Sequence, residues 1–294
     1  MSCRKKLKEL TIKDNFMFGA VMSMEDNCRQ FLELVMKLRI GEICISSEKS
    51  ILFHPEYRGV RLDVYAVDDR NSHYNVEMQV IRRAELSKRA RYYHSQMDME
   101  LLRPGNDYAE LPDTYVIFIC DFDPFDQGLY CYTFENICLE NGILKLNEGC
   151  RSIFLSTCGR VRQGVSEGLV QFLRFVKADL RESQEEFEND FVKQLQASVK
   201  KVKSSREMEE RFMVLEEMLK DERAEGINQG ITQGIARGTA ESLLGLLEAK
   251  GTVPEELKNK VLSEPDLDCL RTWHRIAIHA SSVQQFMAEI QAVK

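Results

Sequence analysis

The sequence predicts a mixed α/β sheet covered by helices and followed by a long helical segment. Two strand-like runs, residues 62–67 and 74–80, alternate apolar and polar side chains and are joined by the polar turn 68–73. A third run, residues 114–122, is apolar on both faces, as is typical of a strand at the centre of a sheet. Helical patterns before, between and after these runs favour helices packed on the faces of the sheet.

Helical periodicity and breaker residues predict the other elements in chain order. We expect a first helix over Thr11–Met22, opened by a capping residue, and a second, amphipathic helix over Cys28–Leu38. A long helix is expected from about Ile81 to Leu102, where Arg103-Pro104-Gly105 stops it. Further short strands are expected near residues 129–134, 143–147 and 152–155.

The character of the chain changes at about residue 180, where long charged helical patterns begin. Residues 179–225 hold 14 acidic and 9 basic residues, and glycine recurs every fourth residue from Gly226 to Gly238. This glycine stripe is consistent with close packing against another helix, in a homo-oligomer, and equally with a flexible or fraying linker helix. We expect three segments: a first domain over 1–180, a helical arm over 181–240 and a small helical tail over 241–294.

Composition restricts the class of protein. The chain has 294 residues, 44% hydrophobic and 30% charged, with a net charge of −7, which describes a globular protein. No apolar run is long enough to span a bilayer, and the basic N-terminus does not lead into a signal peptide, so we expect no membrane partner and a cytoplasmic location. Nine cysteines without a C-x-x-C pair predict buried, reduced thiols in preference to a zinc site or disulfides.

Carboxylates lie within the two strands of the predicted hairpin. Alternation puts Asp63 on one face of the first strand, and Asn75, Glu77 and Gln79 on one face of the second. Because the strands pair, the two acids can meet. The alternative is that this face of the hairpin is solvated and its polar side chains are ordinary surface residues.

The order of these residues resembles the Rpn family of recombination-promoting nucleases, which are PD-(D/E)XK nuclease family transposases. The resemblance covers about residues 8–180, and the glycine-repeat helix and helical tail are also similar to the family's C-terminal half. It is the joint pattern that is specific, and its pieces are Asp14-Asn15-Phe16-Met17-Phe18, Arg61-Leu62-Asp63-Val64-Tyr65-Ala66, Asn75-Val76-Glu77-Met78-Gln79, Arg91-Tyr92-Tyr93, the turn from Pro104-Gly105 to Tyr108, and residues 115–122.

The resemblance implies a restriction-endonuclease-like mixed sheet flanked by helices, with a helical C-terminal extension. It also implies a metal-dependent endonuclease that hydrolyses DNA with little sequence specificity, in bacterial DNA recombination, DNA transfer or phage defence. Asp63, Glu77 and the backbone carbonyl of Met78 would bind Mg²⁺, with Mn²⁺ or another divalent cation as alternatives. Asp63, Glu77 and Gln79 would form the catalytic set, in which Gln79 positions water or phosphate.

Two residues depart from the superfamily signature. Leu62 replaces a proline that contributes no ligand, and Gln79 replaces a lysine, so a neutral amide stands where a cation is usual. The substitution at position 79 leaves open a lapsed nuclease fold that acts as a DNA-binding or partner-binding module. A transposase-associated protein that needs a partner is a third hypothesis.

Further candidate residues lie on two predicted helices. Asp14 is a candidate extra metal ligand, or else a carboxylate favoured by the helix dipole. The helix after the hairpin carries the densest basic cluster of the first domain, which indicates either phosphate contacts or a solvated face. The candidate DNA-binding residues there are Arg82, Arg83, Lys88, Arg89, Arg91, Tyr92 and Gln96.

Overall fold

The computed structural model describes residues 5–51, 60–162 and 164–292. They belong to two compact units, residues 1–212 and 213–294. The division of the chain at residues 180 and 240 stays a prediction. Over the described ranges, no helix combines the length and the apolar character needed to cross a bilayer.

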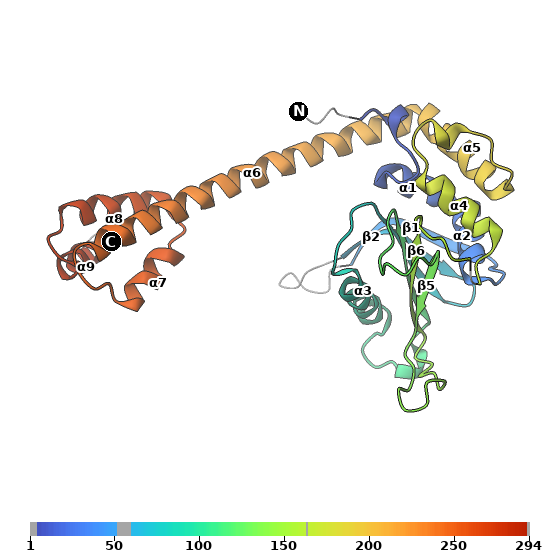
Figure 1. The fold of residues 1–294 in the computed structure, drawn as a ribbon, viewed down its shortest axis with the longest axis horizontal. Helices are drawn as coiled ribbons and strands as arrows, with labels where there is room; N and C mark the ends of the chain where they lie inside the picture. The colour runs from blue at the N-terminus through green and yellow to red at the C-terminus, as the bar shows by residue number, and fades with distance from the viewer. Residues whose placement is uncertain (1–4, 52–59, 163, 293–294) are drawn as a thin grey trace. The chain divides into compact units, whose positions relative to one another are not determined.

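A mixed sheet forms the centre of the first unit (Figure 1). Its strands are β1 (Ile43–Ile51), β2 (Val60–Asp68), β3 (His73–Gln79), β4 (Thr114–Cys120), β5 (Cys131–Phe134) and β6 (Cys150–Ser156). Their order across the sheet is β1-β2-β3-β4-β6-β5. Pairing is parallel between β3 and β4 and between β4 and β6, and antiparallel elsewhere. The predicted mixed sheet with flanking helices is confirmed.

Two strand assignments differ from the sequence-based expectation. β1 was not expected, because the stretch Ile43–Ile51 is rich in serine and charge and pairs at the edge of the sheet. The expected strand at 143–147 is wrong: this stretch is a loop that makes an isolated bridge between Ile137 and Lys145. Its apolar side chains, such as Ile143, are exposed, so no packing fixes them as a strand.

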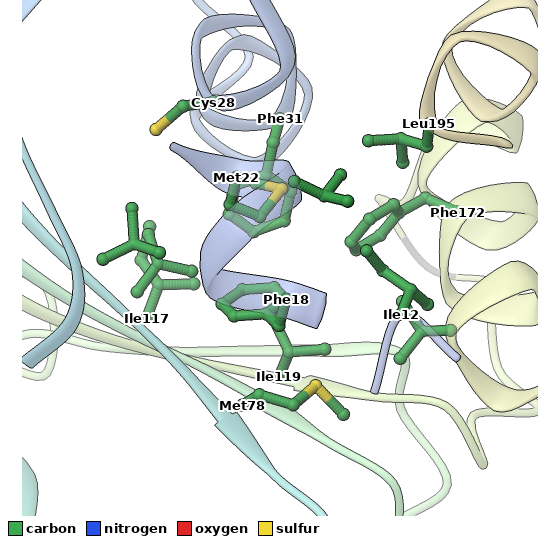
Figure 2. Packing of buried hydrophobic residues seen from close by; sticks show 14 of the residues in the cluster. Ile12, Phe18, Met22, Cys28, Phe31, Met78, Ile117, Ile119, Phe172 and Leu195 are labelled. Carbon is green, nitrogen blue, oxygen red and sulfur yellow. The ribbon is translucent and has the colours of Figure 1, made fainter. Parts of the chain in front are cut away.

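Four helices lie on one side of the sheet: α1 (Asn15–Met22), α2 (Glu25–Met36), α4 (Glu167–Lys177) and α5 (Asp190–Ser204), of which α5 packs on the other three. Figure 2 shows Phe18 of α1 against Met78 and Ile119 of the sheet, with Phe172 of α4 and Leu195 of α5 nearby. Burying these large apolar side chains is the main stabilising contribution to the unit. α1 begins after its N-cap residue Asp14 rather than at the expected Thr11.

Helix α3 (Leu86–Leu101) covers the opposite face (Figure 1). Its side chains Leu86, Ala90, Tyr93 and Met97 recur every three or four residues and are buried against that face, which also includes Phe118. The helix begins at Leu86 and not near Ile81, because residues 81–85 are exposed and form a bend and turn. Short 3₁₀ helices lie at Leu7–Glu9 (η1), Tyr108–Glu110 (η2) and Glu182–Gln184 (η3).

The second unit is helical and has its own core. α6 (Arg206–Glu248) begins in the first unit and continues into the second, followed by α7 (Glu255–Ser263), α8 (Leu267–His279) and α9 (Val283–Ala292). Leu247, Trp273 and Phe286 are among its buried residues. The glycine repeat lies inside α6, so this segment is helical despite the cost of about 1 kcal/mol that each glycine adds.

Truncation tests where the first unit ends. Phe191, Val192 and Leu195 of α5 are buried in its core, and Phe212 packs on Phe16 with ring centroids 5.1 Å apart. Each buried side chain contributes roughly 1.5–3 kcal/mol, so we expect a chain ending at Lys177 to lose cooperative folding. A chain ending at Ala224 should unfold in a single transition in urea, followed by circular dichroism. Equal transition midpoints for the two chains would contradict this expectation.

The burial of His94 predicts that the free energy of unfolding falls in acid. This α3 residue is buried between the hydroxyls of Thr114 and Ser152, at 2.8 and 3.2 Å, and burial lowers its pKa to about 4. An unfolded histidine takes up its proton near pH 6.5. The free energy of unfolding should therefore fall as the pH drops from about 6.5 to 4, by at most about 1.4 kcal/mol per pH unit. Urea titrations of His94→Gln should show a weaker dependence, with the remainder coming from groups such as His73, whose pKa burial also lowers, whereas the exposed control His279→Asn should keep the full dependence.

Candidate active site

Glu77 lies in the middle of the sheet, on the face that α3 covers. Its register partner on β4 is Phe118, which packs among the side chains of α3. Asn75 and Gln79 share this face with Glu77, because alternate side chains of a strand point the same way. Every residue of β3 is buried, so all three polar side chains are held inside the protein.

Asp63 meets Glu77 at the point where β2 and β3 separate. Described pairing between the two strands ends at Val64 and Val76. Beyond it, the Asp63 N–H donates to Glu77 Oε1 at 3.2 Å, and the Met78 N–H donates to Asp63 Oδ2 at 3.1 Å. The carboxylates thus replace ladder hydrogen bonds across the gap. The structure brings together the two acids that the sequence singles out.

Arg89 of α3 contacts Glu77 from the helix that covers this face of the sheet. Its guanidinium Nη2 donates to Glu77 Oε2 at 2.7 Å, and Nη1 donates to Gln79 Oε1 at 3.1 Å. Its Nε donates to the Tyr93 hydroxyl at 2.6 Å, and that hydroxyl donates to Glu77 Oε2 at 3.2 Å. Arg89 and Tyr93 are four residues apart and therefore share one face of the helix. Around Arg89, the hydrogen bonds thus connect one acid, one amide, one phenol and one guanidinium.

Burial dominates the electrostatics of Glu77. Its side chain has no solvent exposure, and burial, followed by the nearby Asp63 carboxylate, raises its pKa, while Arg89 acts in the opposite direction. The pKa of Tyr93 is also raised, first by burial and then by Glu77. A charge removed from water in this way requires a partner. The ion pair with Arg89 provides one.

Asn75 is an unusual feature of the same face. The residue has no exposure, and neither its amide nitrogen nor its carbonyl oxygen has a partner with good hydrogen-bond geometry in the described structure, although its side chain is near enough to Glu77 to lower the pKa of that acid slightly. An unsatisfied buried polar group costs about 1–3 kcal/mol. An amide two residues before Glu77 on the same face of β3 is suited to hold a water molecule, such as one carried by a cation.

The oxygens at the gap fit a hydrated divalent cation. Asp63 and Glu77 offer carboxylates, and the Met78 carbonyl faces the same gap as its N–H, because both groups of a strand residue point to one edge. Throughout the described segments, no three or more His, Cys, Asp or Glu side chains form a group that could hold a metal. A cation here would therefore depend on these three groups and on water, as Mg²⁺ commonly does.

The hydrogen bonds that the structure describes for Asp14 lead away from the carboxylate pair. It is the N-cap residue of α1, whose buried side chains pack in the core on the other face of the sheet. Its Oδ1 pairs with Lys5 Nζ at 2.8 Å, and its Oδ2 accepts from the Thr11 N–H at 2.7 Å. Its side chain makes no capping hydrogen bond to α1, and its position at the N-terminus of this helix is the one that the helix-dipole alternative describes.

The basic cluster divides into exposed and inward-facing residues. Arg83, Lys88 and Arg91 are exposed, and Arg82 is exposed and pairs with Asp126. Tyr92 is half-buried. Gln96 is buried, which removes it from any surface that DNA could contact, and Arg89 points into the site described above.

Sequence analysis missed the roles of Arg89 and Tyr93 in this network. The signal that could have found them is the spacing of four residues between a cation and a phenol on the helix that follows the two acidic strands. A buried carboxylate is costly without a nearby cation, and the helix that covers its face of the sheet is one place where such a cation is to be expected. The predicted roles of Asp63, Glu77 and Gln79 in catalysis stay predictions.

Comparison with known proteins identifies the family. A sequence profile of the PD-(D/E)XK nuclease family transposases matches residues 13–228, which is more than two thirds of the chain. Comparisons with curated proteins and with solved structures gave no match. Nucleases of this kind generally use divalent cations and act on DNA, in agreement with the acids at the strand gap. The chain belongs to the PD-(D/E)XK nuclease family transposases.

Proposed function

We propose that this protein is a metal-dependent endonuclease that hydrolyses DNA phosphodiester bonds with little sequence preference. The observation that carries the proposal is the pair Asp63 and Glu77, held across the gap between β2 and β3 with Gln79 on the same face. Phosphodiester hydrolysis needs an activated water and compensation of the negative charge that develops on the phosphate. Mg²⁺, or Mn²⁺ in its place, would supply both when bound between these acids.

The remaining residues have roles that follow from their hydrogen bonds. Gln79 Oε1 accepts from Arg89, which leaves the amide Nε2 to donate to a phosphate oxygen or to the attacking water. The Met78 N–H holds Asp63 Oδ2 and so orients that carboxylate toward the gap. Arg89 and Tyr93 both donate to Glu77 Oε2, which fixes the rotamer of this acid. Such prior ordering of the reacting groups lowers the barrier to reaction.

The second candidate function is a lapsed nuclease that binds DNA without cutting it. It is favoured by Gln79, which cannot supply the positive charge of a lysine. It is disfavoured by the cost of keeping the buried carboxylate of Glu77, since a binding surface does not need it. Incubating the protein with supercoiled and linear DNA in Mg²⁺, Mn²⁺ or EDTA distinguishes the two. DNA binding without cutting in either metal would favour the lapsed nuclease.

Exposed cations on α3 and just before it support DNA as the substrate. Lys88 and Arg91 of α3, and Arg83 in the turn before it, can contact phosphates without reading bases, which fits a low sequence preference. A role in bacterial DNA recombination, DNA transfer or phage defence is our interpretation of the family, and a partner protein in transposition is its alternative. We also infer a cytoplasmic location, which agrees with the free thiols of the eight described cysteines.

Replacing Asp63 tests the metal site. Asp63→Asn keeps an oxygen that can accept from the Met78 N–H, but it removes one of the two negative charges that would hold the cation. We expect DNA nicking in Mg²⁺ to fall roughly 100-fold or more, and Mn²⁺ binding, measured by electron paramagnetic resonance, to weaken.

The matched control is Asp69→Asn, an exposed acid at the turn of the same hairpin. It should cut DNA and bind Mn²⁺ like the unaltered protein. Unaltered nicking by Asp63→Asn, or full activity of the unaltered protein in EDTA, would show that Asp63 is not a metal ligand.

We infer that the glycine-repeat part of α6 mediates self-association. Ile227, Ile231 and Ile235 are about half exposed, at 56, 55 and 47%. A Cβ added to the neighbouring glycines, such as Gly230, would meet nothing within 4 Å. An apolar stripe beside small residues suits a second helix that approaches closely, and a copy of this chain offers an identical stripe.

A single charge on this stripe tests the self-association. Ile231→Lys should lower the molar mass measured by light scattering, because a buried lysine without a partner weakens the contact. Gln233→Lys adds the same charge at an exposed polar position of the same helix and should leave the mass unchanged. A monomeric mass for the unaltered protein would refute the inference.

A further inference from the structure

The carboxylates of the site create an electrostatic problem for any DNA substrate. Asp63 and Glu77 place two acids at the gap, and the polar side chains on the same face of β3, Asn75 and Gln79, are neutral. A phosphodiester also carries negative charge, so its approach is unfavourable without positive charge close by. Across the described segments, the cation that hydrogen bonds to Glu77 is Arg89, which comes from the helix and not from the strand.

Arg89 is held in a defined position. Its guanidinium carbon lies 5.1 Å from the centroid of the Tyr93 ring and 5.8 Å from that of Phe118, and these two rings stack on each other. Contacts with aromatic faces stabilise a guanidinium and fix its plane. The same side chain donates to Glu77, Gln79 and Tyr93, so these three acceptor groups are already ordered when substrate arrives.

Arg89 also retains donors for a further partner. The described hydrogen bonds use three of the five N–H groups of a guanidinium, and its side chain is 31% exposed while that of Glu77 is fully buried. Arg89 therefore spans from the interior of the site to its solvent side. This is the position from which one cation can contact both the buried acid and an incoming phosphate oxygen.

We propose that Arg89 is the positioning cation of the site: it supplies from α3 the positive charge that Gln79 lacks, holds Glu77 and Gln79 in place, and faces the phosphate to be cut. The inference rests on the proposed endonuclease function. It separates Arg89 from the other candidate DNA-binding residues of the basic cluster, because Arg89 alone of that cluster hydrogen bonds to Glu77 in the described structure. It also gives Gln79 a defined orientation, because its amide oxygen is fixed by Arg89.

Three variants and one control test this role. Arg89→Met removes the charge at similar volume, Gln79→Lys places a charge on the strand, and the double variant moves the charge from the helix to the strand. Arg103→Met removes an exposed arginine just beyond the end of α3 and serves as the control. Urea unfolding reports whether each protein folds, and in the double variant the lysine keeps a cation beside the buried acid.

Cleavage and DNA affinity are measured first. Arg89→Met should nick DNA roughly 100-fold more slowly, while its affinity for a labelled duplex in EDTA, measured by fluorescence anisotropy, changes less than about threefold. The double variant should recover at least about tenfold of the lost rate, since the charge is restored at the site. A loss of DNA affinity that accounts for the whole loss of rate, or no recovery in the double variant, would overturn the proposal.

Mn²⁺ affinity gives a readout that does not depend on cleavage. Because Arg89 and a bound cation repel each other, Arg89→Met should bind Mn²⁺ several-fold more tightly, by roughly fivefold in electron paramagnetic resonance titrations. Arg103→Met should bind it like the unaltered protein. Weaker Mn²⁺ binding by Arg89→Met would mean that Arg89 only maintains the shape of the acids, and would refute the role proposed here. If the unaltered protein cuts no DNA, the endonuclease function fails, and the Mn²⁺ titration still tests the electrostatic role of Arg89.

Discussion

The buried carboxylate of Glu77 is the constraint on which the rest of the first unit depends. An acid without solvent exposure in the middle of a sheet is costly unless hydrogen bonds and a counter-charge satisfy it. The separation of β2 from β3 gives Oε1 the Asp63 N–H as a donor, and α3 gives Oε2 the guanidinium of Arg89. The separation of β2 from β3 and the position of α3 therefore both serve to stabilise the buried charge of Glu77.

The two faces of β3 divide the tasks of the strand. Tyr74, Val76 and Met78 belong to the apolar core under α1, α2, α4 and α5, whereas Asn75, Glu77 and Gln79 face α3. Close packing of the first face limits the movement of the backbone. The polar side chains of the second face are consequently carried by a rigid support, which is what a catalytic arrangement requires.

Period-2 alternation predicted the strands that carry Asp63 and Glu77, and the structure brings these acids together because alternation is a local property of the chain. What could not be predicted depends on long-range packing. The serine-rich β1 is a strand because β2 pairs with it, and residues 143–147 are a loop because no strand pairs along them in the described structure. Likewise, composition marks Arg89 as one more basic residue of a helix. Its inward direction is set by the contact of α3 with the sheet.

A cation carried by a helix has different properties from a cation on the strand that carries Glu77. A lysine on β3 would be a flexible point charge next to the acids, whereas the fork of Arg89 binds an acid and an amide at once and rests on two aromatic rings. Its position thus depends on how α3 packs, through Tyr93 and Phe118, and not on the strand alone. The exposed residues Lys88 and Arg91 lie on that same helix. DNA that contacts these exposed cations would therefore contact the same helix that positions Arg89. Through α3, DNA binding at the surface is physically connected to the positions of Arg89 and Glu77.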